Sequence, residues 1–156
     1  MGMDLPPFQA LFEDNRTDVY AFLVAMVGSQ DAEDCWQETW LSALRSYPKL
    51  RDASNLRSWV MTIAHRKALD VLRRRGSEPR PSERVPDSVS DPSADHEPAL
   101  WAKLRGLPPK QRSSVFLRVV GDMTYAEVAW ILECSEDAAR QSARQGLNKL
   151  REELRT

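Results

Sequence analysis

Apolar residues recur at helical spacing in three successive stretches of the first half of the chain. The first stretch places on one face Phe8, Leu11, Phe12, Val19, Phe22, Leu23, Met26 and Val27. The second places on one face Ala32, Cys35, Trp36, Thr39, Trp40, Ala43, Leu44 and Tyr47. The third follows a loop and contributes Leu56, Trp59, Val60, Ile63, Ala64, Val71 and Leu72. This periodicity predicts three amphipathic helices that pack as a small all-α domain over residues 5–75.

Helix ends and core aromatics follow from the same stretch. Gly28 is placed to end the first helix, and Asp31 is a plausible N-cap for the second. We interpret Trp36 and Trp40 as core residues, because large aromatic side chains supply much of the buried area of a small domain. Trp59 is either a core residue or a stacking platform for a free base, and we favour the core.

The sequence pattern of residues 98–156 predicts a second helical domain that contains a helix-turn-helix. Pro109 suits the first position of a helix that runs to Gly121. Thr124 and Glu127 form a capping-box pattern at the start of the next helix, and Ser135 can cap the last one after a break at Glu133. The inward stripe of the last helix is predicted to be Ala139, Ala143, Leu147, Leu150 and Leu154. Two helices joined by a tight turn form the unit whose second helix enters the major groove.

The outward face of the last helix carries side chains that can read bases. It consists of Arg140, Gln141, Arg144, Gln145 and Asn148. Arginine can donate to guanine, and glutamine or asparagine can pair with adenine, whereas Lys149 and Arg151 are better placed for phosphate. An amphipathic helix with a solvated basic face would show the same pattern.

Between the two domains, residues 76–97 are rich in proline and serine and nearly lack apolar residues. Such a segment cannot bury enough surface to fold alone, so we interpret it as a flexible linker. At ~3.3 Å per residue, its roughly 22 residues span up to about 70 Å, which would let the domains sit far apart on a long ligand.

Composition describes a soluble globular protein, with 42% hydrophobic and 29% charged residues in a chain of 156. No apolar run approaches the roughly 20 residues of a membrane helix, and the N-terminus shows no secretion signal. Metal-ligand spacing is absent from the cysteines, Cys35 and Cys134, and from the histidines, His65 and His96. We therefore expect a cytoplasmic protein with no metal, no cofactor and no enzymatic activity.

Charge is segregated along the chain although the net charge is only −1. Acids dominate from Glu13 to Asp52, and basic residues gather from Arg66 to Arg75 and from Arg140 to Arg155. This distribution suits a protein that offers one face to a basic protein partner and others to phosphate. Ordinary solvated faces would give the same composition.

The second predicted helix has a polar face opposite its core stripe, formed by Asp34, Gln37, Glu38, Leu41 and Arg45. Leu41 lies in the middle of this face, where it buries nothing in its own domain. Periodicity supports two interpretations equally, a scattered surface leucine or an apolar anchor for a partner.

The segment Asp31 to Arg75 resembles region two of bacterial sigma-70-type factors, specifically the extracytoplasmic-function (ECF) class. The matching residues are Ala32, Glu33, Asp34, Gln37, Glu38, Trp59, Ile63, Ala64, Asp70 and Arg73. The resemblance implies that the face Asp34, Gln37, Glu38, Leu41 and Arg45 docks on the clamp helices of RNA polymerase. It also implies that the −10 promoter element is opened and held by Arg51, Ser54, Asn55, Leu56, His65, Arg66, Lys67, Arg73 and Arg74. Arg66 departs from the family pattern, which usually has Asn there.

The second half resembles sigma region four, which reads the −35 element. Its matching residues are Leu107, Pro108, Arg112, Leu117, Arg118, Tyr125, Glu127, Ala129, Leu132, Ser135, Leu150 and Arg151. The resemblance implies that −35 DNA is bound by Thr124, Tyr125, Ser135, Arg140, Gln141, Arg144, Gln145 and Asn148. Glu133 replaces the usual turn glycine, and Ser142 and Gln145 stand where the family commonly has arginine.

Together these resemblances imply an ECF-type sigma factor that binds core RNA polymerase through its clamp helices and flap and directs it to promoter DNA. They also imply an anti-sigma protein that covers the polymerase-binding faces. The alternative is a sigma-like helix-turn-helix regulator or decoy that does not start transcription. Such a protein would have no use for Leu41 on an acidic face. An all-α enzyme has little support, because no metal-ligand spacing or Gly-rich phosphate loop is present.

Overall fold

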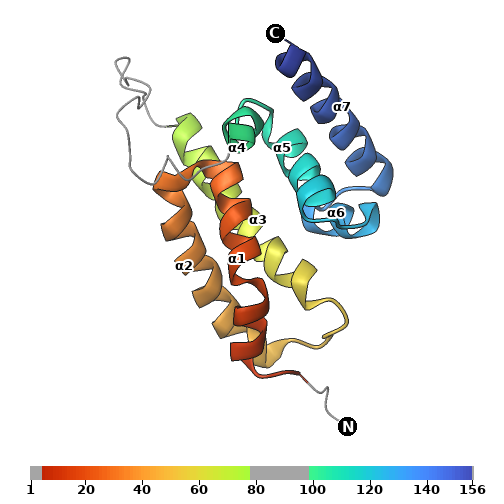
Figure 1. The fold of residues 1–156 in the computed structure, drawn as a ribbon. Coiled ribbons are helices and arrows are strands. Elements are labelled where there is room, and N and C mark those ends of the chain that lie inside the picture. Colours follow the sequence, from red (N-terminus) through yellow and green to blue (C-terminus); the bar gives the residue numbers. More distant parts are fainter. Residues whose placement is uncertain (1–4, 78–98, 156) are drawn as a thin grey trace.

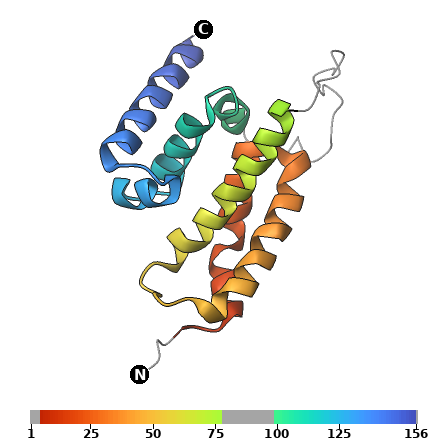
Figure 2. The same cartoon turned by 180° about the vertical axis from the view of Figure 1, so that it is seen from behind.

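The computed structural model describes residues 5–77 and 99–155, and within these ranges all regular structure is helical. The helices are α1 (Phe8–Val27), α2 (Ser29–Ser46), a 3₁₀ turn (Tyr47–Lys49), α3 (Leu56–Ser77), α4 (Ala99–Leu104), α5 (Pro109–Val115), a π-helical turn (Phe116–Val120), α6 (Tyr125–Leu132) and α7 (Glu136–Arg155). Figures 1 and 2 show α1, α2 and α3 side by side in one bundle, with α4 to α7 beside it. The predicted all-α class is confirmed. None of the helices in the described ranges has the length and apolar character needed to cross a membrane.

The three-helix bundle has a core of aliphatic and aromatic side chains. Phe22, Leu23 and Met26 of α1 are fully buried, and so are Val60 and Met61 of α3. At the other end of the bundle, aromatic rings pack edge to face, with Phe12 4.9 Å from Trp40 between ring centroids. Such pairs stabilise a fold beyond the area that they bury.

The tryptophans follow the prediction closely. Trp40 is buried, whereas Trp36 is half-buried and donates its indole N–H to the carbonyl oxygen of Arg16 at 3.0 Å. Trp59 is also half-buried, with its ring centroid 6.0 Å from that of Tyr47, so it belongs to the edge of the core.

Two predictions about α2 are wrong. Leu44, which was expected in the core, is 52% exposed. The helix also begins two residues before Asp31, with Gly28 as its N-cap at φ 91°, a conformation that suits glycine. Asp31 instead lies in the first turn and pairs with Arg75 of α3.

The second half contains the predicted helix-turn-helix. The capping box is complete: the Thr124 hydroxyl accepts from the Glu127 N–H at 3.1 Å, and the Glu127 carboxylate accepts from the Thr124 N–H at 2.8 Å. Ser135 accepts from the N–H of Ala138 at 3.0 Å and so opens α7 as expected. At Gly146, α7 lies against α5 so closely that an added Cβ would come within 2.6 Å of a Val115 methyl carbon.

Leu154 is more exposed than the inward stripe of the last helix predicts, and two valines that follow α5 are exposed as well. The regular helix α5 ends at Val115, and the π-helical turn that follows leaves Val119 and Val120 exposed. A π-helical turn adds a residue to each turn, which rotates the following side chains off the buried stripe. Leu154 is 63% exposed because α7 extends beyond the helices that could cover it.

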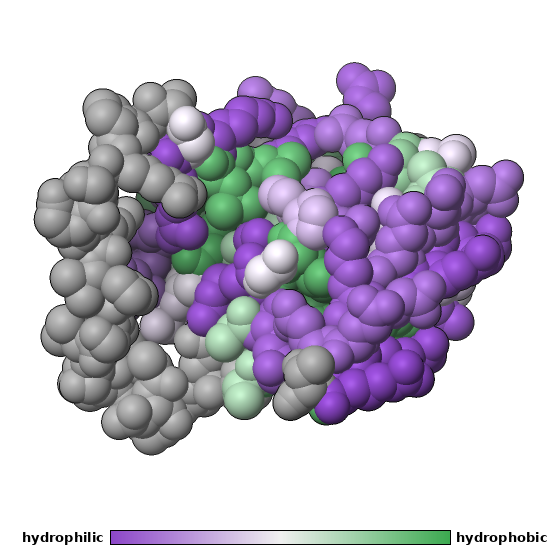
Figure 3. All heavy atoms as spheres, turned by 90° about the horizontal axis from the view of Figure 1, so that it is seen from above, coloured by the Kyte–Doolittle hydropathy of each residue, from purple (hydrophilic) through white to green (hydrophobic). Residues whose placement is uncertain are grey.

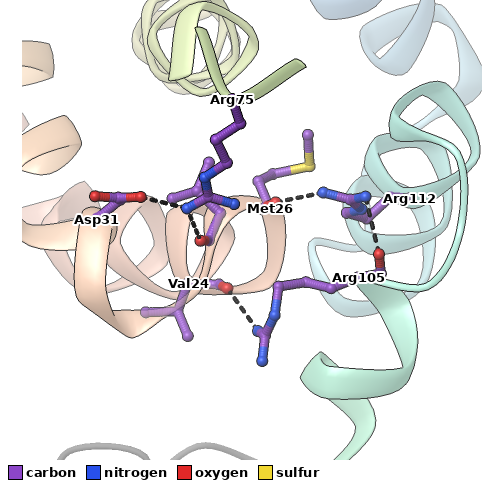
Figure 4. Close-up of polar contacts among 7 residues, drawn as sticks. Val24, Met26, Asp31, Arg75, Arg105 and Arg112 are labelled. Carbon is purple, nitrogen blue, oxygen red and sulfur yellow. Dashed lines mark hydrogen bonds and ion pairs between the residues drawn. The ribbon is translucent and has the colours of Figure 1, made fainter. Parts of the chain in front are cut away.

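The two halves pack directly against each other. The ring centroid of Phe22 on α1 lies 5.5 Å from that of Phe116, and the ring centroid of Trp101 lies 5.2 Å from that of Phe116. Backbone carbonyls at the end of α1 accept from arginines of the second half: Arg105 donates to Val24 at 3.0 Å, and Arg112 donates to Met26 (Figure 4). One hydrophobic core therefore runs through both halves.

Candidate partner and nucleic-acid interfaces

The proposed polymerase-binding residues form one exposed face of α2. Asp34, Gln37, Glu38, Leu41 and Arg45 are all exposed, with Leu41 at 51%. Leu44 is three residues beyond Leu41 and equally exposed, so the apolar part of this face holds two leucines rather than one. Helix α2 lies on the far side of the bundle from α7 (Figure 1). This face is therefore open to a partner while the two halves stay packed.

The loop before α3 carries the first group of residues predicted to hold the −10 element. Arg51, Ser54 and Asn55 are exposed, and Leu56 is half-buried. The Asp52 carboxylate accepts from the Ser54 N–H at 2.9 Å, and this bond lowers the pKa of Asp52. Asn55 caps α3, because its side-chain oxygen accepts from the Ser58 N–H at 3.0 Å. The loop thus has a defined shape before any DNA arrives.

The second group of these residues lies along α3. Arg66, Arg73 and Arg74 are exposed, and Lys67 is half-buried. Arg73 pairs with Asp70 at 3.1 Å. His65 is only 5% exposed, with its ring centroid 6.2 Å from that of Phe22, so in this arrangement it cannot reach DNA.

Several residues of the loop and of α3 contact the second half of the chain. Asn55 donates to the Glu127 carboxylate at 2.8 Å, and Arg66 pairs with Glu133 at 3.3 Å. Arg57 donates to the Gly121 carbonyl oxygen at 2.6 Å. These contacts could not be predicted from the sequence. The one signal for them was that Arg66 and Glu133, which depart separately from the family pattern, carry opposite charges.

The proposed −35 residues lie on the exposed side of the helix-turn-helix. Along α7, the exposed side chains include Arg140, Gln141, Arg144, Gln145 and Asn148. Figure 3 shows hydrophilic side chains over the right-hand part of its view, the side on which α7 lies in Figure 1. Such a row of donors and acceptors suits the base edges of a major groove.

Other −35 candidates are held by local contacts. Tyr125 is half-buried, and the guanidinium groups of Arg118 and Arg140 lie over its ring at 4.8 Å and 4.9 Å from the centroid. Thr124 and Ser135 are exposed, but their hydroxyls cap α6 and α7. Gln145 accepts from the side-chain amide of Gln111 at 3.3 Å.

Ser142 does not belong to the DNA-facing row. It is 9% exposed and so faces the inside of the helix-turn-helix. An arginine there would have no room to point toward DNA from the present helix orientation. The serine at position 142, where the family commonly has arginine, therefore does not itself remove a phosphate contact. Gln145, which also replaces a common arginine, is exposed and lies on the proposed DNA face.

His65 makes the stability of the protein depend on pH. Burial lowers the pKa of its imidazole to about 4, helped by Arg66 and opposed by Glu133. Between pH 6.5 and 4 the unfolded chain binds the proton and the folded chain does not, so stability falls as the pH falls. We expect a loss of about 2 kcal/mol from His65 between pH 7 and pH 5.

Urea unfolding at the two pH values measures this loss, with His65→Gln as the reference variant. The variant should lose less stability on acidification than the parent by about that amount. An equal loss in both proteins would show that His65 does not carry the effect.

Comparison with known proteins gives matches over both halves of the chain. The model of sigma-70 region 2 matches residues 11–78, and that of sigma-70, region 4 matches residues 98–150. The RNA polymerase sigma factor CarQ of Myxococcus xanthus is 34% identical, covering 94% of this chain and 88% of CarQ. The ECF RNA polymerase sigma factor SigX of Bacillus subtilis is 26% identical over 94% of this chain and 83% of SigX.

Solved structures share the fold. The sigma factor RpoE in its complex with the anti-sigma factor NepR from Bartonella quintana superposes with a TM-score of 0.77 at 20% identity, covering 97% of this chain and 99% of that one. CnrH, solved in complex with the cytosolic domain of CnrY, superposes with a TM-score of 0.74 at 18% identity over 94% of this chain and 86% of CnrH. With both regions matched in order and a 34% identical relative aligned along nearly its whole length, the chain belongs to the sigma-70 family of RNA polymerase sigma factors, in its ECF class.

Proposed function

We propose that this chain binds core RNA polymerase through α2 and directs it to promoters through the loop before α3, the exposed face of α3 and helix α7. The observation that carries the proposal is the exposed α2 face, in which two leucines stand among Asp34, Gln37 and Glu38. A plain helix-turn-helix repressor has no use for such a face. The chain supplies the choice of start site, and the catalysis belongs to the polymerase.

At the polymerase, Leu41 and Leu44 would enter an apolar recess while the surrounding polar side chains exclude water. Buried apolar anchors ringed by polar contacts supply most of the binding energy in interfaces of this kind. The acidic groups steer the approach toward a basic surface and make binding weaken with salt. The second half would make a further contact with the polymerase flap.

At the promoter, α7 would lie in the major groove of the −35 element with Arg140, Gln141 and Arg144 at base edges. The loop Arg51 to Leu56 would capture an unstacked base of the −10 element, and Arg73 and Arg74 would hold the melted strand. Flipping a base costs a few kcal/mol, which contacts with the polymerase must offset. Since its partners are the polymerase and chromosomal DNA, we place the protein in the cytoplasm.

Replacing Arg144 by alanine tests the proposed role of α7. We expect a loss of about 1–3 kcal/mol of binding to a preferred −35 sequence, roughly 5- to 150-fold, together with relaxed preference at one base position. Lys149→Ala is the matched control, because the loss of a phosphate contact weakens binding to all sequences about equally. Equal losses across sequences for both variants would contradict base reading by Arg144.

An anti-sigma protein is also part of the proposal. The structures of RpoE and CnrH to which this chain is similar were solved with the anti-sigma factor NepR and with the cytosolic domain of CnrY, respectively. For this chain we infer a regulator that covers the leucines of α2, because it would then block the polymerase at its apolar anchor.

Run-off transcription tests the proposed function as a whole. Core RNA polymerase would be supplied with the purified full chain and a DNA library randomised at −35 and −10. We expect transcripts that depend on the chain and that share sequence at both elements. Transcripts without shared sequence, or none at all, would overturn the proposal in favour of a regulator that does not start transcription.

A further inference from the structure

Arg140, in the proposed −35 row of α7, is held in place by two other side chains. Its guanidinium carbon lies 4.9 Å from the ring centroid of Tyr125 at the start of α6. Its Nη1 donates to the Asp137 carboxylate, one turn earlier on α7, at 3.1 Å. The Arg140 side chain is accordingly only 44% exposed, although it belongs to the outward face of the helix. Among the described residues, Arg144 has no hydrogen bond, ion pair or ring contact of this kind.

We propose that Tyr125 and Asp137 are positioning residues, which hold the Arg140 guanidinium ready to donate to a guanine of the −35 element. The inference rests on the proposed role of α7 in −35 binding. It changes the role expected for Tyr125, from a side chain that touches DNA itself to one that acts through Arg140.

The Tyr125 ring is itself fixed, as a positioning group must be. Its backbone begins α6 directly after Thr124, where the reciprocal hydrogen bonds between Thr124 and Glu127 close the capping box. The ring is half-buried, and the Arg118 guanidinium lies over it at 4.8 Å. Arg118 is in turn held, since it donates to the Met123 carbonyl oxygen at 3.0 Å. The ring is therefore a firm surface for a second guanidinium.

Restraint of Arg140 before binding favours recognition of a single base. A free arginine side chain loses much of its rotamer freedom when it is fixed against DNA, and that loss weakens binding. An arginine that already lies on an aromatic ring loses less. The Asp137 side chain is 98% exposed, so its pair with Arg140 is weak by itself, and the Tyr125 ring supplies the larger restraint.

The Asp137 carboxylate favours a base over a phosphate as the ligand of Arg140. It offsets the positive charge of the guanidinium and repels a phosphate that approaches the same side. The pair uses Nη1 of Arg140. The other edge of the guanidinium, formed by Nε and Nη2, is a planar fork that matches the two major-groove acceptors of guanine, O6 and N7.

Base preference is measured by binding a pool of double-stranded DNA with a randomised core to the purified full-length chain and sequencing the bound molecules. Arg140→Ala should reduce the preference for guanine at one position by about 5- to 150-fold. Tyr125→Leu should reduce it at the same position by about two- to fivefold, the loss expected for one exposed cation–π contact. Tyr125→Phe keeps the ring and should match the parent.

A double-variant cycle separates positioning from a general effect on the fold. In an Arg140→Ala background, Tyr125→Leu should cost no further guanine preference, because no guanidinium is left to position. In an Arg144→Ala background, the matched control, Tyr125→Leu should cost its full two- to fivefold. A tyrosine that only stabilises the helix-turn-helix would instead weaken binding to all sequences in both backgrounds, and this result would overturn the inference.

Asp137→Asn is compared with Glu136→Gln, a matched control that removes the other acid of the first turn of α7. Both variants should bind all DNA sequences more tightly, because each loses one charge that repels phosphate. Asp137→Asn should in addition lose about twofold in guanine preference, the loss expected for one surface ion pair. Equal guanine preference in the two variants would remove Asp137 from the proposal.

The restraint on Arg140 is also measured without DNA, as the NMR order parameter of its Nε–H group. In the parent this order parameter should exceed that of Arg144, and in Tyr125→Leu it should fall to the Arg144 value. Equal order parameters of the two arginines in the parent would contradict the inference. Urea unfolding shows that each variant remains folded.

The ways of failing are distinct. If Arg140→Ala leaves every base preference unchanged, Arg140 does not read DNA, and that part of the proposed function falls together with the inference. If Arg140→Ala removes a preference for a base other than guanine, or if Tyr125→Phe loses as much preference as Tyr125→Leu, the inference alone is overturned. The same holds if Tyr125→Leu leaves the preference unchanged.

Discussion

Replacing Leu41 by aspartate is expected to weaken the binding of core RNA polymerase by at least about 30-fold, the ratio for the 2 kcal/mol that a central interface anchor contributes. Leu41 is 51% exposed and packs little against its own domain, so the free energy of unfolding should change by less than about 0.5 kcal/mol. A fluorescence titration of labelled chain with core polymerase measures the affinity, and urea unfolding measures the stability.

Leu154→Asp provides the matched control for this experiment. Leu154 is another exposed leucine, at 63%, and it lies at the end of α7, away from α2. We expect its replacement to leave the affinity for polymerase near that of the parent. Comparable losses from the two substitutions would mean that added charge, and not the α2 face, weakens binding. No loss from either would remove α2 from the polymerase interface.

Replacing Arg112 by alanine is expected to destabilise the fold by about 3 kcal/mol or more, because buried carbonyl groups would lose their donors. The Arg112 guanidinium is buried and donates to the backbone carbonyl oxygen of Met26 in the first half. Within its own half it donates to the backbone carbonyl oxygens of Arg105 at 3.0 Å and Leu107 at 2.9 Å. Burial, followed by the nearby Arg105 and Arg75, lowers its pKa to about 10, so the group stays charged at neutral pH. Urea unfolding measures the loss.

Arg112→Lys separates charge from geometry. An ammonium cannot match the planar fork that serves carbonyls in different directions, so the lysine variant should recover only part of the stability. Arg151→Ala, at an exposed arginine of α7, should cost less than about 0.5 kcal/mol. A loss below about 1 kcal/mol for Arg112→Ala would mean that water replaces the guanidinium and that this contact does not hold the halves together.

Periodicity and capping chemistry predicted the helices because they act over a few residues. The Thr124 and Glu127 capping box and the Ser135 cap are local contacts, and the structure contains both. Leu44 and Leu154 were placed in the core because they continue a stripe. Whether a helix neighbour covers the end of a stripe depends on tertiary packing, which the stripe itself does not encode.

The contacts between the halves could not be predicted from the sequence. The proline-rich composition of residues 76–97 indicates a loose connection, and a loose connection permits both separated and packed domains. Most of that segment lies outside the described residues, although Gly76 and Ser77 continue α3. Packing depends instead on complementary shapes around Phe22 and Phe116 and on which carbonyls Arg105 and Arg112 reach.

The roles of individual arginines could not be predicted from the sequence either. Arg75 closes a basic run that suggested phosphate binding, but it donates to the Val27 carbonyl oxygen at 2.6 Å and pairs with Asp31 (Figure 4). Its side chain therefore ties α3 to the junction of α1 and α2. Arg73 and Arg74 are exposed and remain predicted DNA contacts. An arginine that binds phosphate and one that binds carbonyls look alike until the fold is known.

Equilibrium binding of the purified full chain to bacterial core RNA polymerase at low ionic strength tests the central claim most directly. We predict a saturable one-to-one complex that weakens as salt is added, since the acidic α2 face contributes through screened charges. A chain that is folded by circular dichroism and yet does not associate with core polymerase under these conditions would contradict the account.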